Sequence, residues 1–310
     1  MNKKNVALWA LYDFANSIPV IVFLLYFSQW LVVDNNIPDL WYNLIFTGSS
    51  LLLLFTSPIA GAIADKIKIR MPFLIVLTVL MFISLFLSSA FAVLLPVGTQ
   101  AALLASVAFM FANYFYQFSF SFYNAILPDL GSKQSQGFIS GIGQTANWSG
   151  QIAGILITLP LATGAIVLIG NPGRAQTFLP ATLLFFFLAL PMLIFLKDKS
   201  PREKVKIDLA YEYKNLFVRL KQLLKTEGVG RFLIGYFFFN DAMVTAVSNF
   251  PIFLDEVFKI SDKTKSILVM AILVTSAIGA FLVGWLSDKI GLKKMLLFAD
   301  SQLRKLFLKF

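Results

Sequence analysis

The chain has 310 residues, of which 58% are hydrophobic and 14% are charged, and its formal net charge is +10. A soluble domain averages about 25% charged residues, so this composition indicates an integral membrane protein. The sequence contains no Cys and no His, which excludes disulfides, thiol nucleophiles, Cys/His metal sites and histidine acid–base chemistry. We expect no cofactor and no metal.

Apolar runs recur along the chain, and a membrane-spanning helix needs about 20 such residues. We count eight runs, at roughly 9–32, 42–64, 72–95, 102–126, 137–162, 178–196, 231–254 and 264–287. The first run continues well past the length of a signal-peptide core and lacks a small-residue cleavage site, so we expect no cleaved leader.

The basic residues divide unequally between the two sides of the membrane. If the N-terminus is cytoplasmic, nineteen Lys and Arg fall on the inside, three in the tail stay unassigned, and four fall outside: Arg174, Lys259, Lys263 and Lys265. Because cytoplasmic loops are enriched in basic residues, we predict a multi-pass protein of the cell (inner) membrane with a cytoplasmic N-terminus. The positive charge then requires no nucleic-acid partner.

The long polar stretch 197–230 contains a helical pattern. Its apolar residues recur at helical spacing: Leu209, Tyr213, Leu216, Phe217, Leu220 and Leu224. Lys214, Lys221 and Lys225 fall mostly elsewhere around the helix. Two interpretations stay open: an amphipathic helix on the cytoplasmic membrane surface, or a solvated linker helix.

Two seven-residue segments are similar and occupy equivalent positions: GAIADKI at 61–67 and GWLSDKI at 284–290. Each follows an apolar run and begins a basic loop, and each is preceded by an aspartate inside an apolar run, Asp13 or Asp241. We interpret the pattern as two parallel halves joined by a long loop. The expected units are 1–196, a six-helix half; 197–230, the central loop; and 231–310, the start of the second half with a polar tail.

The repeated segment resembles the loop motif of the major facilitator superfamily, Gly-x-x-x-Asp-x-x-Gly-Arg-Arg after the second helix of each half. The matching residues are Gly61, Asp65, Lys66 and Arg70 in the first copy and Gly284, Asp288, Lys289 and Gly291 in the second. Lys68 stands where the first copy would have its second glycine.

Three further stretches resemble one branch of that superfamily, which contains the fungal vacuolar autophagy-related amino-acid effluxer and its bacterial relatives. They are WALYDFANS (9–17), FYNAILPDL (122–130) and SGIGQTANWSGQIAG (140–154). The resemblance implies an all-α helical bundle in the lipid bilayer, built from two six-helix repeats. It also implies secondary transport of a small solute by alternating access, with amino-acid efflux favoured.

The C-terminal end departs from the superfamily pattern. Only eight of an expected twelve helices are present, and the tail FADSQLRKLFLKF (298–310) is too charged to cross a bilayer. We therefore expect a C-terminally truncated member. In the superfamily the loop motif holds the two halves together on the cytoplasmic side. The partner of the first copy would be an absent helix, whereas the partner of the second, the fifth helix, is present.

Polar side chains in hydrocarbon face a bundle interior or a cavity, and they gather on single faces of the first, fourth, fifth and seventh runs. The candidate solute or proton contacts are Asp13, Asn16, Asn113, Gln117, Asn124, Gln144, Asn147, Asn240 and Asp241. The third and sixth runs have no charged or amide side chain, so we expect them to face lipid. Gly143, Gly150 and Gly154 form a ridge of small residues where another helix can approach closely.

The candidate residues also have structural interpretations. Asp13 is near enough to the chain start to reach the headgroups, whereas Asp241 lies ten residues past Arg231, too deep to do so easily. Inside a cavity, the two carboxylates would bind a cationic group of the solute or carry a proton. Helix–helix hydrogen bonds explain the amides about as well as solute contacts do.

Three functions stay open at this point. The favoured one is a secondary transporter of a small polar solute. The second is a truncated relative without transport activity of its own, inert or acting as a membrane scaffold or assembly partner. The third, a membrane-embedded enzyme, is disfavoured because the sequence has no intramembrane protease motif and no clustered acidic metal motif.

Overall fold

A computed structural model describes residues 3–62, 70–96, 98–132, 135–198 and 209–290. Within these ranges the chain forms helices joined by turns and contains no β-strand. The α-helices are α1 (Lys3–Val22), α2 (Asp39–Ala62), α3 (Met71–Leu94), α4 (Thr99–Leu130), α5 (Gln136–Ala162), α6 (Phe178–Phe195), α7 (Leu209–Lys225), α8 (Val229–Glu256) and α9 (Asp262–Ile290). The π-helical segments η1 (Phe23–Phe27) and η2 (Trp30–Asp34) extend α1, and the 3₁₀ turn η5 (Arg174–Thr177) precedes α6.

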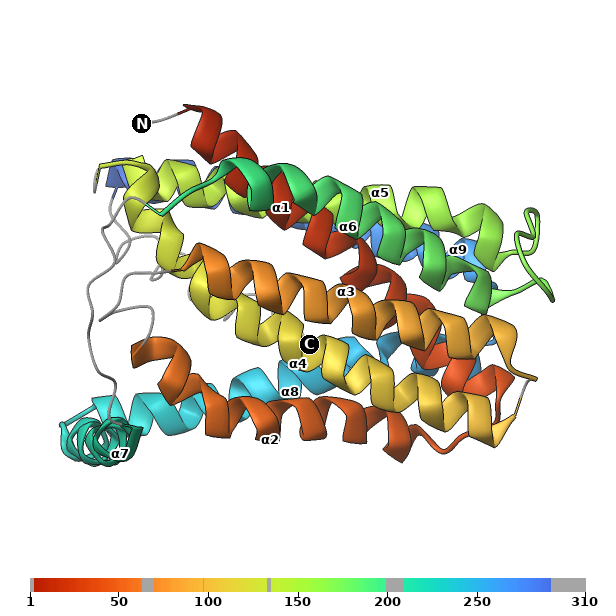
Figure 1. The fold of residues 1–310 in the computed structure, drawn as a ribbon, viewed down its shortest axis with the longest axis horizontal. Helices are drawn as coiled ribbons and strands as arrows, with labels where there is room; N and C mark the ends of the chain where they lie inside the picture. Colours follow the sequence, from red (N-terminus) through yellow and green to blue (C-terminus); the bar gives the residue numbers. More distant parts are fainter. Residues whose placement is uncertain (1–2, 63–69, 97, 133–134, 199–208, 291–310) are drawn as a thin grey trace, which may run out of the picture.

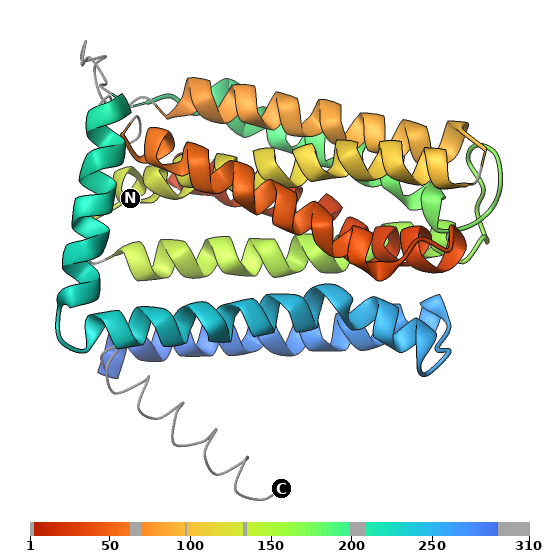
Figure 2. The same ribbon diagram turned by 90° about the horizontal axis from the view of Figure 1, so that it is seen from below.

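All helices except α7 run along the long axis of the molecule (Figure 1). Helix α7 lies crosswise at one end of this bundle, as Figure 2 shows. We call this end the α7 end. The opposite end, which holds the connection between α5 and α6, is the Arg174 end. The predicted all-α membrane bundle is thus confirmed, and each of the eight apolar runs is a helix.

The helix bounds differ from the predicted runs by a few residues in most cases. The largest difference is at the start, where α1 begins at Lys3 instead of residue 9. Val6 is buried in the hydrophobic core. Burial of Val6 therefore stabilises the first turns of α1. A prediction of helix bounds from apolar runs does not include this contact.

Within the described residues, six helical segments are long and apolar enough to cross a membrane. They are α1 with its π-helical extension, α2, α3, α4, η5 with α6, and α8. Helix α5 is not among them, because its amide side chains lower its mean hydropathy, and neither is α9, much of whose later side-chain structure lies outside the description. The total of eight crossings stays a prediction.

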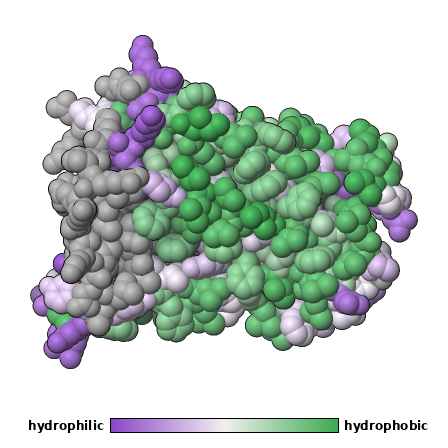
Figure 3. Space-filling view, in the orientation of Figure 1, coloured by the Kyte–Doolittle hydropathy of each residue, from purple (hydrophilic) through white to green (hydrophobic). Residues whose placement is uncertain are grey.

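The lateral face of the bundle seen in Figure 3 is mostly hydrophobic, and hydrophilic side chains gather towards its two ends. Leu54 and Phe55 of α2 and Val76 and Phe86 of α3 are exposed on this surface. Contiguous exposed apolar area of this extent marks a surface that contacts lipid or another protein. This pattern agrees with a bundle whose long axis crosses a bilayer.

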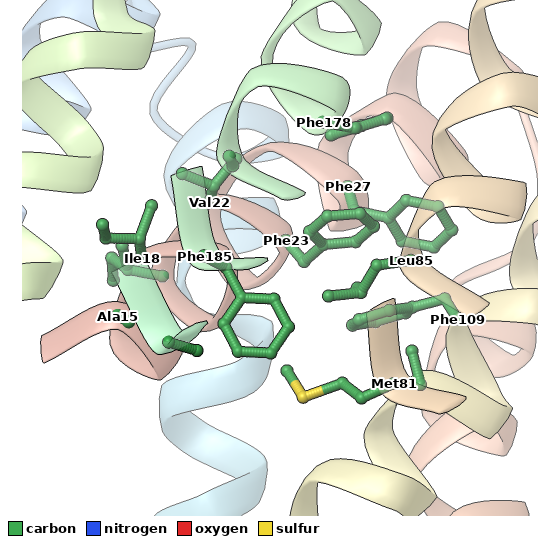
Figure 4. Close-up of a cluster of buried hydrophobic side chains, with 14 of the residues drawn as sticks. Ala15, Ile18, Val22, Phe23, Phe27, Met81, Leu85, Phe109, Phe178 and Phe185 are labelled. Carbon is green, nitrogen blue, oxygen red and sulfur yellow. The ribbon is translucent and has the colours of Figure 1, made fainter. Parts of the chain in front are cut away.

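Helix α1 lies inside the bundle and most of its side chains are buried. It packs along α5 and α6, while α3 packs along α4 and α6. An aromatic cluster joins these layers (Figure 4): the ring of Phe23 lies 4.8 Å from that of Phe109 and 5.0 Å from that of Phe178, measured between centroids. Aromatic pairs at such separations stabilise a core beyond their area burial.

The expected division between cavity-lining and lipid-facing helices holds in part. Phe187 and Ile194 of α6, like Val76 of α3, are exposed on outer faces, in line with the peripheral place expected for these two helices. Helix α8, expected to line a cavity, instead exposes most of its described side chains. It contacts the bundle mainly at η1, η2 and α7.

Candidate functional site

A chain of polar side chains joins α1 to α5. Asp13 on α1 is only 3% exposed, and its Oδ1 accepts a hydrogen bond from Asn147 Nδ2 at 2.9 Å. Asn147 Oδ1 in turn accepts one from Gln151 Nε2 at 2.8 Å. The carboxylate of Asp13 also interacts with the Tyr123 hydroxyl of α4. Asp13 is therefore an interior group held between three helices, which excludes the interpretation that it reaches out to the headgroups.

The small-residue ridge of α5 explains how α1 comes so close. A Cβ added at Gly150 would lie 2.2 Å from the Phe14 carbonyl oxygen, and one at Gly143 would lie 2.5 Å from the Trp9 ring. Only glycine leaves room for these contacts, because any larger residue would push the helices apart. The expectation that this ridge admits another helix is confirmed, and the helix is α1.

Reciprocal contacts hold α1 against α4 beside the carboxylate. The rings of Trp9 and Tyr123 stack at 4.7 Å with an interplanar angle of 2°. Trp9 Nε1 donates to the Tyr123 carbonyl at 3.3 Å, and the Tyr123 hydroxyl donates to the Trp9 carbonyl at 3.1 Å. These bonds fix the rotation of α1, so that Asp13 faces the α4–α5 side.

Asn16, one turn after Asp13, has no exposed surface. Its Oδ1 and Nδ2 form no hydrogen bond of regular geometry in the described part of the chain, although the amide lies close enough to the Tyr12 hydroxyl to interact with it. An unsatisfied buried amide costs about 1–3 kcal/mol, and such groups in native proteins call for an explanation such as a bound water or ligand. Asn16 is therefore a buried amide near Asp13 whose hydrogen-bonding capacity the described residues leave largely unused.

The other amide candidates on α4 and α5 divide into two groups. Asn113 Nδ2 donates to Ser49 Oγ of α2 at 2.7 Å, and Gln117 Nε2 lies 3.5 Å from the same oxygen. Asn124 and Gln144 are exposed. Asn113 and Gln117 therefore join α4 to α2, which is the helix–helix role that the sequence left open for them.

Asn240 and Asp241 on α8 are exposed, and the described residues show no hydrogen bond or ion pair that connects Asp241 to Asp13. The sequence predicts that Asp241 lies deeper in the membrane than Asp13, and this stays a prediction. In the structure Asp13 is buried between helices and Asp241 is exposed on α8. The difference arises because α8 packs loosely, while α1 is enclosed by α4, α5 and α6.

The repeated loop motif is described only in part. Asp65, Lys66 and Gly291 lie outside the described residues, and for Gly61, Gly284, Asp288 and Lys289 only the helical backbone of α2 and α9 is described. Helix α9 packs along α5, which is the neighbour expected for the second copy.

Arg70, the last motif residue of the first copy, is at the start of α3. Its guanidinium forms an ion pair with Asp129 at the end of α4. The backbone amides of Arg70 and Met71 donate to the carboxylate of Asp198, just past α6, at 3.2 Å. A carboxylate at a helix N-terminus satisfies free amides and complements the helix dipole. Arg70 and Asp198 thus tie α3, α4 and α6 together at the α7 end.

A model of the family described as Major Facilitator Superfamily matches residues 6–301. The chain belongs to this superfamily. The match extends from α1 to beyond α9, so it includes both copies of the repeated loop motif and confirms the superfamily resemblance seen in the sequence. A comparison with the curated proteins finds no match. The chain is thus a multi-pass membrane protein of a family of transporters.

This superfamily member has a second polar cluster, at the Arg174 end, that the sequence argument missed. Arg174 of η5 contacts three carboxylates: Asp34 at 2.6 Å, Asp255 at 2.7 Å and Asp262 at 3.0 Å. Lys265 of α9, 1% exposed, contacts Asp255 at 2.6 Å and Asp262 at 2.8 Å. We call these five residues the Arg174 cluster.

The Arg174 cluster connects the two parts of the chain on either side of the central loop. Asp34 and Arg174 precede the loop, whereas Asp255, Asp262 and Lys265 follow it. Lys265 Nζ also donates to Gln29. Close by, Tyr26 and Ser266 share a hydrogen bond of 2.8 Å between their hydroxyls.

Asn43 and Asn249 add a second tie across the two parts of the chain. Each donates an amide hydrogen to the other's carbonyl oxygen, at 3.3 and 3.1 Å. An open pocket beside this pair is lined by the start of α2 and the end of α8.

One sequence signal could have revealed the Arg174 cluster. Asp262 and Lys265 stand at i, i+3, at the start of an otherwise apolar helix.

Proposed function

We propose that the chain is a secondary transporter that moves a small polar solute across the membrane by alternating access, and that the solute contacts Asp13. The observation that carries this proposal is the setting of Asp13, a buried carboxylate that accepts a hydrogen bond from the neutral Asn147 amide and lies close to the neutral Tyr123 hydroxyl. A buried carboxylate without a cation destabilises a fold. A positive group brought by the solute, or a proton, compensates that charge during transport.

An amino acid fits these groups as the solute. Its ammonium would pair with Asp13, and the amide of Asn16 would bind its polar end. The resemblance of residues 9–17, 122–130 and 140–154 to the amino-acid effluxer branch supports the same class and suggests efflux. A proton that neutralises Asp13 when the solute is absent would couple transport to a pH gradient.

Alternating access requires two halves that separate at one end and meet at the other. The proposed halves are residues 1–196 and 231–310. The Arg174 cluster and the Asn43–Asn249 pair join them at the Arg174 end, so this conformer is closed there. We propose that transport breaks and reforms these ties. With the N-terminus cytoplasmic, as the distribution of basic residues predicts, the Arg174 end faces outward.

The repeated loop motif would act at the α7 end. The packing of α9 along α5 supports a contact of Asp288 with the cytoplasmic end of α5. For Asp65 the superfamily pattern places the partner on a helix beyond the eight recognised here. We therefore propose that the Asp288 contact forms within the helices recognised here.

A second candidate function is an assembly partner without transport activity of its own. It is favoured by Asp241, which is exposed among exposed aromatic residues of α8 such as Phe237 and Phe238. A carboxylate facing lipid is costly, and such residues normally face protein or water. This surface of α8 therefore suits contact with a further membrane helix.

Reconstitution separates the two candidates. The purified chain in liposomes is tested with a panel of labelled amino acids, with and without a pH gradient. If the chain is a transporter, liposomes that contain it take up the solute, and this uptake falls when they contain Asp13→Asn instead. An assembly partner gives no uptake with any solute, and its oligomeric state shows a second polypeptide or a second copy. Uptake that is unchanged in Asp13→Asn would contradict the proposed site while leaving transport itself established.

A further inference from the structure

Helix α7 has an apolar face that the bundle leaves largely uncovered. An arc of about 120° on a helix of 3.6 residues per turn holds Leu209, Tyr213, Leu216, Phe217, Leu220, Leu223 and Leu224, whereas Tyr211 and Val218 lie on the opposite side. Phe217 is 66% exposed, and Leu216, Leu220, Leu223 and Leu224 are also exposed. In the described part of the chain, the side-chain hydrogen bond from this face to the bundle is made by Tyr213, whose hydroxyl donates to the Phe55 carbonyl of α2.

The orientation of α7 indicates which medium covers this face. The bundle helices run along the long axis, which we take to cross the membrane, and α7 lies crosswise to them at one end of the bundle (Figure 2). A helix in that position lies in the plane of the membrane surface. The Tyr213 contact turns the apolar arc towards Phe55, itself 65% exposed on the lateral surface of α2. The uncovered part of the arc therefore faces the apolar layer that surrounds the bundle.

The charges of α7 flank this arc. Lys214, Lys221 and Lys225 lie along one border of the arc, and Arg219 lies along the other. Glu212 is the single acidic residue of the helix. Cations beside an apolar stripe place the stripe below the headgroups and the charges among the phosphates.

We propose that α7 is a docking surface for anionic lipid: its apolar arc inserts between the acyl chains, and its lysines bind the negatively charged headgroups. This role is independent of the transported solute. Because α7 continues into α8 and contacts α2, lipid bound there holds the two proposed halves at a fixed height in the membrane. Of the two interpretations that the sequence left open, the membrane-surface helix is the one that the orientation and the uncovered face support.

The experiment uses the full chain, which has no native cysteine to interfere with labelling. A fluorescent bimane is attached to Phe217→Cys, in the apolar arc, or to Gln222→Cys, on the opposite face. Each protein is placed in nanodiscs that contain brominated phosphatidylglycerol or brominated phosphatidylcholine at the same mole fraction. Iodide in the buffer reports access from water.

We expect bromine to quench the label at 217 and iodide to quench the label at 222. Brominated phosphatidylglycerol should quench the label at 217 about twofold or more strongly than brominated phosphatidylcholine, because each basic residue enriches anionic lipid nearby. The double variant Lys214→Gln, Lys221→Gln should bring this ratio close to one. The matched control Lys259→Gln, Lys263→Gln removes two exposed lysines at the Arg174 end and should leave the ratio unchanged.

Three outcomes would overturn the proposal. Quenching of both labels by iodide would show a solvated linker helix. Shielding of the label at 217 from both quenchers would show that protein covers the face. Equal quenching by the two brominated lipids in the parent chain would show insertion without headgroup binding. None of these outcomes depends on solute transport, so they do not bear on the proposed function.

Discussion

Asp13 and Asp262 are both carboxylates enclosed between helices, yet their surroundings differ in charge. Asp262 contacts Arg174 and Lys265, two cations within 3.0 Å. Asp13 has the neutral Asn147 at 2.9 Å and the Tyr123 hydroxyl. The charge of a carboxylate that contacts cations is already neutralised, and such a carboxylate stabilises one arrangement of the helices. A carboxylate with neutral partners can accept a positive group from a ligand. The same side chain is thus paired with cations in Asp262 and bonded to a neutral amide in Asp13, where we propose that the solute binds.

The largest effect is expected at the Arg174 cluster. Arg174→Gln leaves Asp34, Asp255 and Asp262 with Lys265 as their single cation in the cluster. Removing one partner of a buried ion pair typically costs about 3–5 kcal/mol, and we expect a loss of unfolding free energy towards the lower end of that range because the cluster is partly exposed. Denaturant unfolding in detergent measures it.

The control for this prediction is Lys259→Gln. Lys259 pairs with Glu256 at 3.4 Å on the surface, and a pair of this kind is worth about 0–1 kcal/mol. If both variants changed stability equally, the Arg174 cluster would be no more than a set of surface pairs, and the contrast with Asp13 would lose its basis.

At Asp13 we expect the opposite balance, with a loss of transport instead of stability. Asp13→Asn keeps the shape and one acceptor but carries no charge. A hydrogen bond to a charged group is worth about 1.5–3 kcal/mol, so the transport rate should fall about 10–100-fold, while the unfolding free energy stays the same or rises. Liposome uptake and denaturant unfolding are the two measurements.

Asp39→Asn is the matched control, because Asp39 is an exposed carboxylate at the start of α2. It should change neither quantity by much. A large loss of stability in Asp13→Asn with normal uptake would identify Asp13 as a structural residue of the α1–α5 contact.

The next effect concerns the packing that brings Asn147 to Asp13. Gly150→Ala places a methyl group 2.2 Å from the Phe14 carbonyl, so α1 and α5 must separate. Overpacking of this kind costs about 1–3 kcal/mol, and the shift should also weaken transport by lengthening the Asp13–Asn147 bond. Gly141→Ala, on the same helix with no atom within 4 Å of the added Cβ, should stabilise the chain by about 0.5–1 kcal/mol. Destabilisation of similar size by both variants would show that the cost does not come from the close approach of α1, because the Cβ added at Gly141 meets no atom within 4 Å.

The smallest effect is expected at Asn16, and its sign is informative. Asn16→Leu removes a buried amide that forms no hydrogen bond of regular geometry with the described residues. The free energy of unfolding should therefore rise by about 1 kcal/mol, while solute affinity falls. A decrease in stability would mean that ordered water satisfies the amide in the resting protein, and Asn16 would then belong with the structural amides Asn113 and Gln117.

Much of the fold follows from the local sequence. Each apolar run of about 20 residues became a helix, because a helix satisfies its own backbone hydrogen bonds and hydrophobic length needs no distant partner to be recognised. The amphipathic spacing in 209–225 predicted α7 for the same reason. The glycines 143, 150 and 154 indicated a close helix contact on α5, although the partner helix could not be read from them.

Tertiary structure alone decided which polar groups meet. Asp13 and Asn147 are 134 positions apart, and the stacking and reciprocal bonds of Trp9 and Tyr123 set the rotation of α1 that joins them. The Arg174 cluster draws its residues from separate segments before and after the central loop, so the local pattern does not mark it as a unit. Hydrophobic length and periodicity are properties of neighbouring residues, whereas the neutralisation of a buried charge depends on residues that only the packed bundle brings within 3 Å.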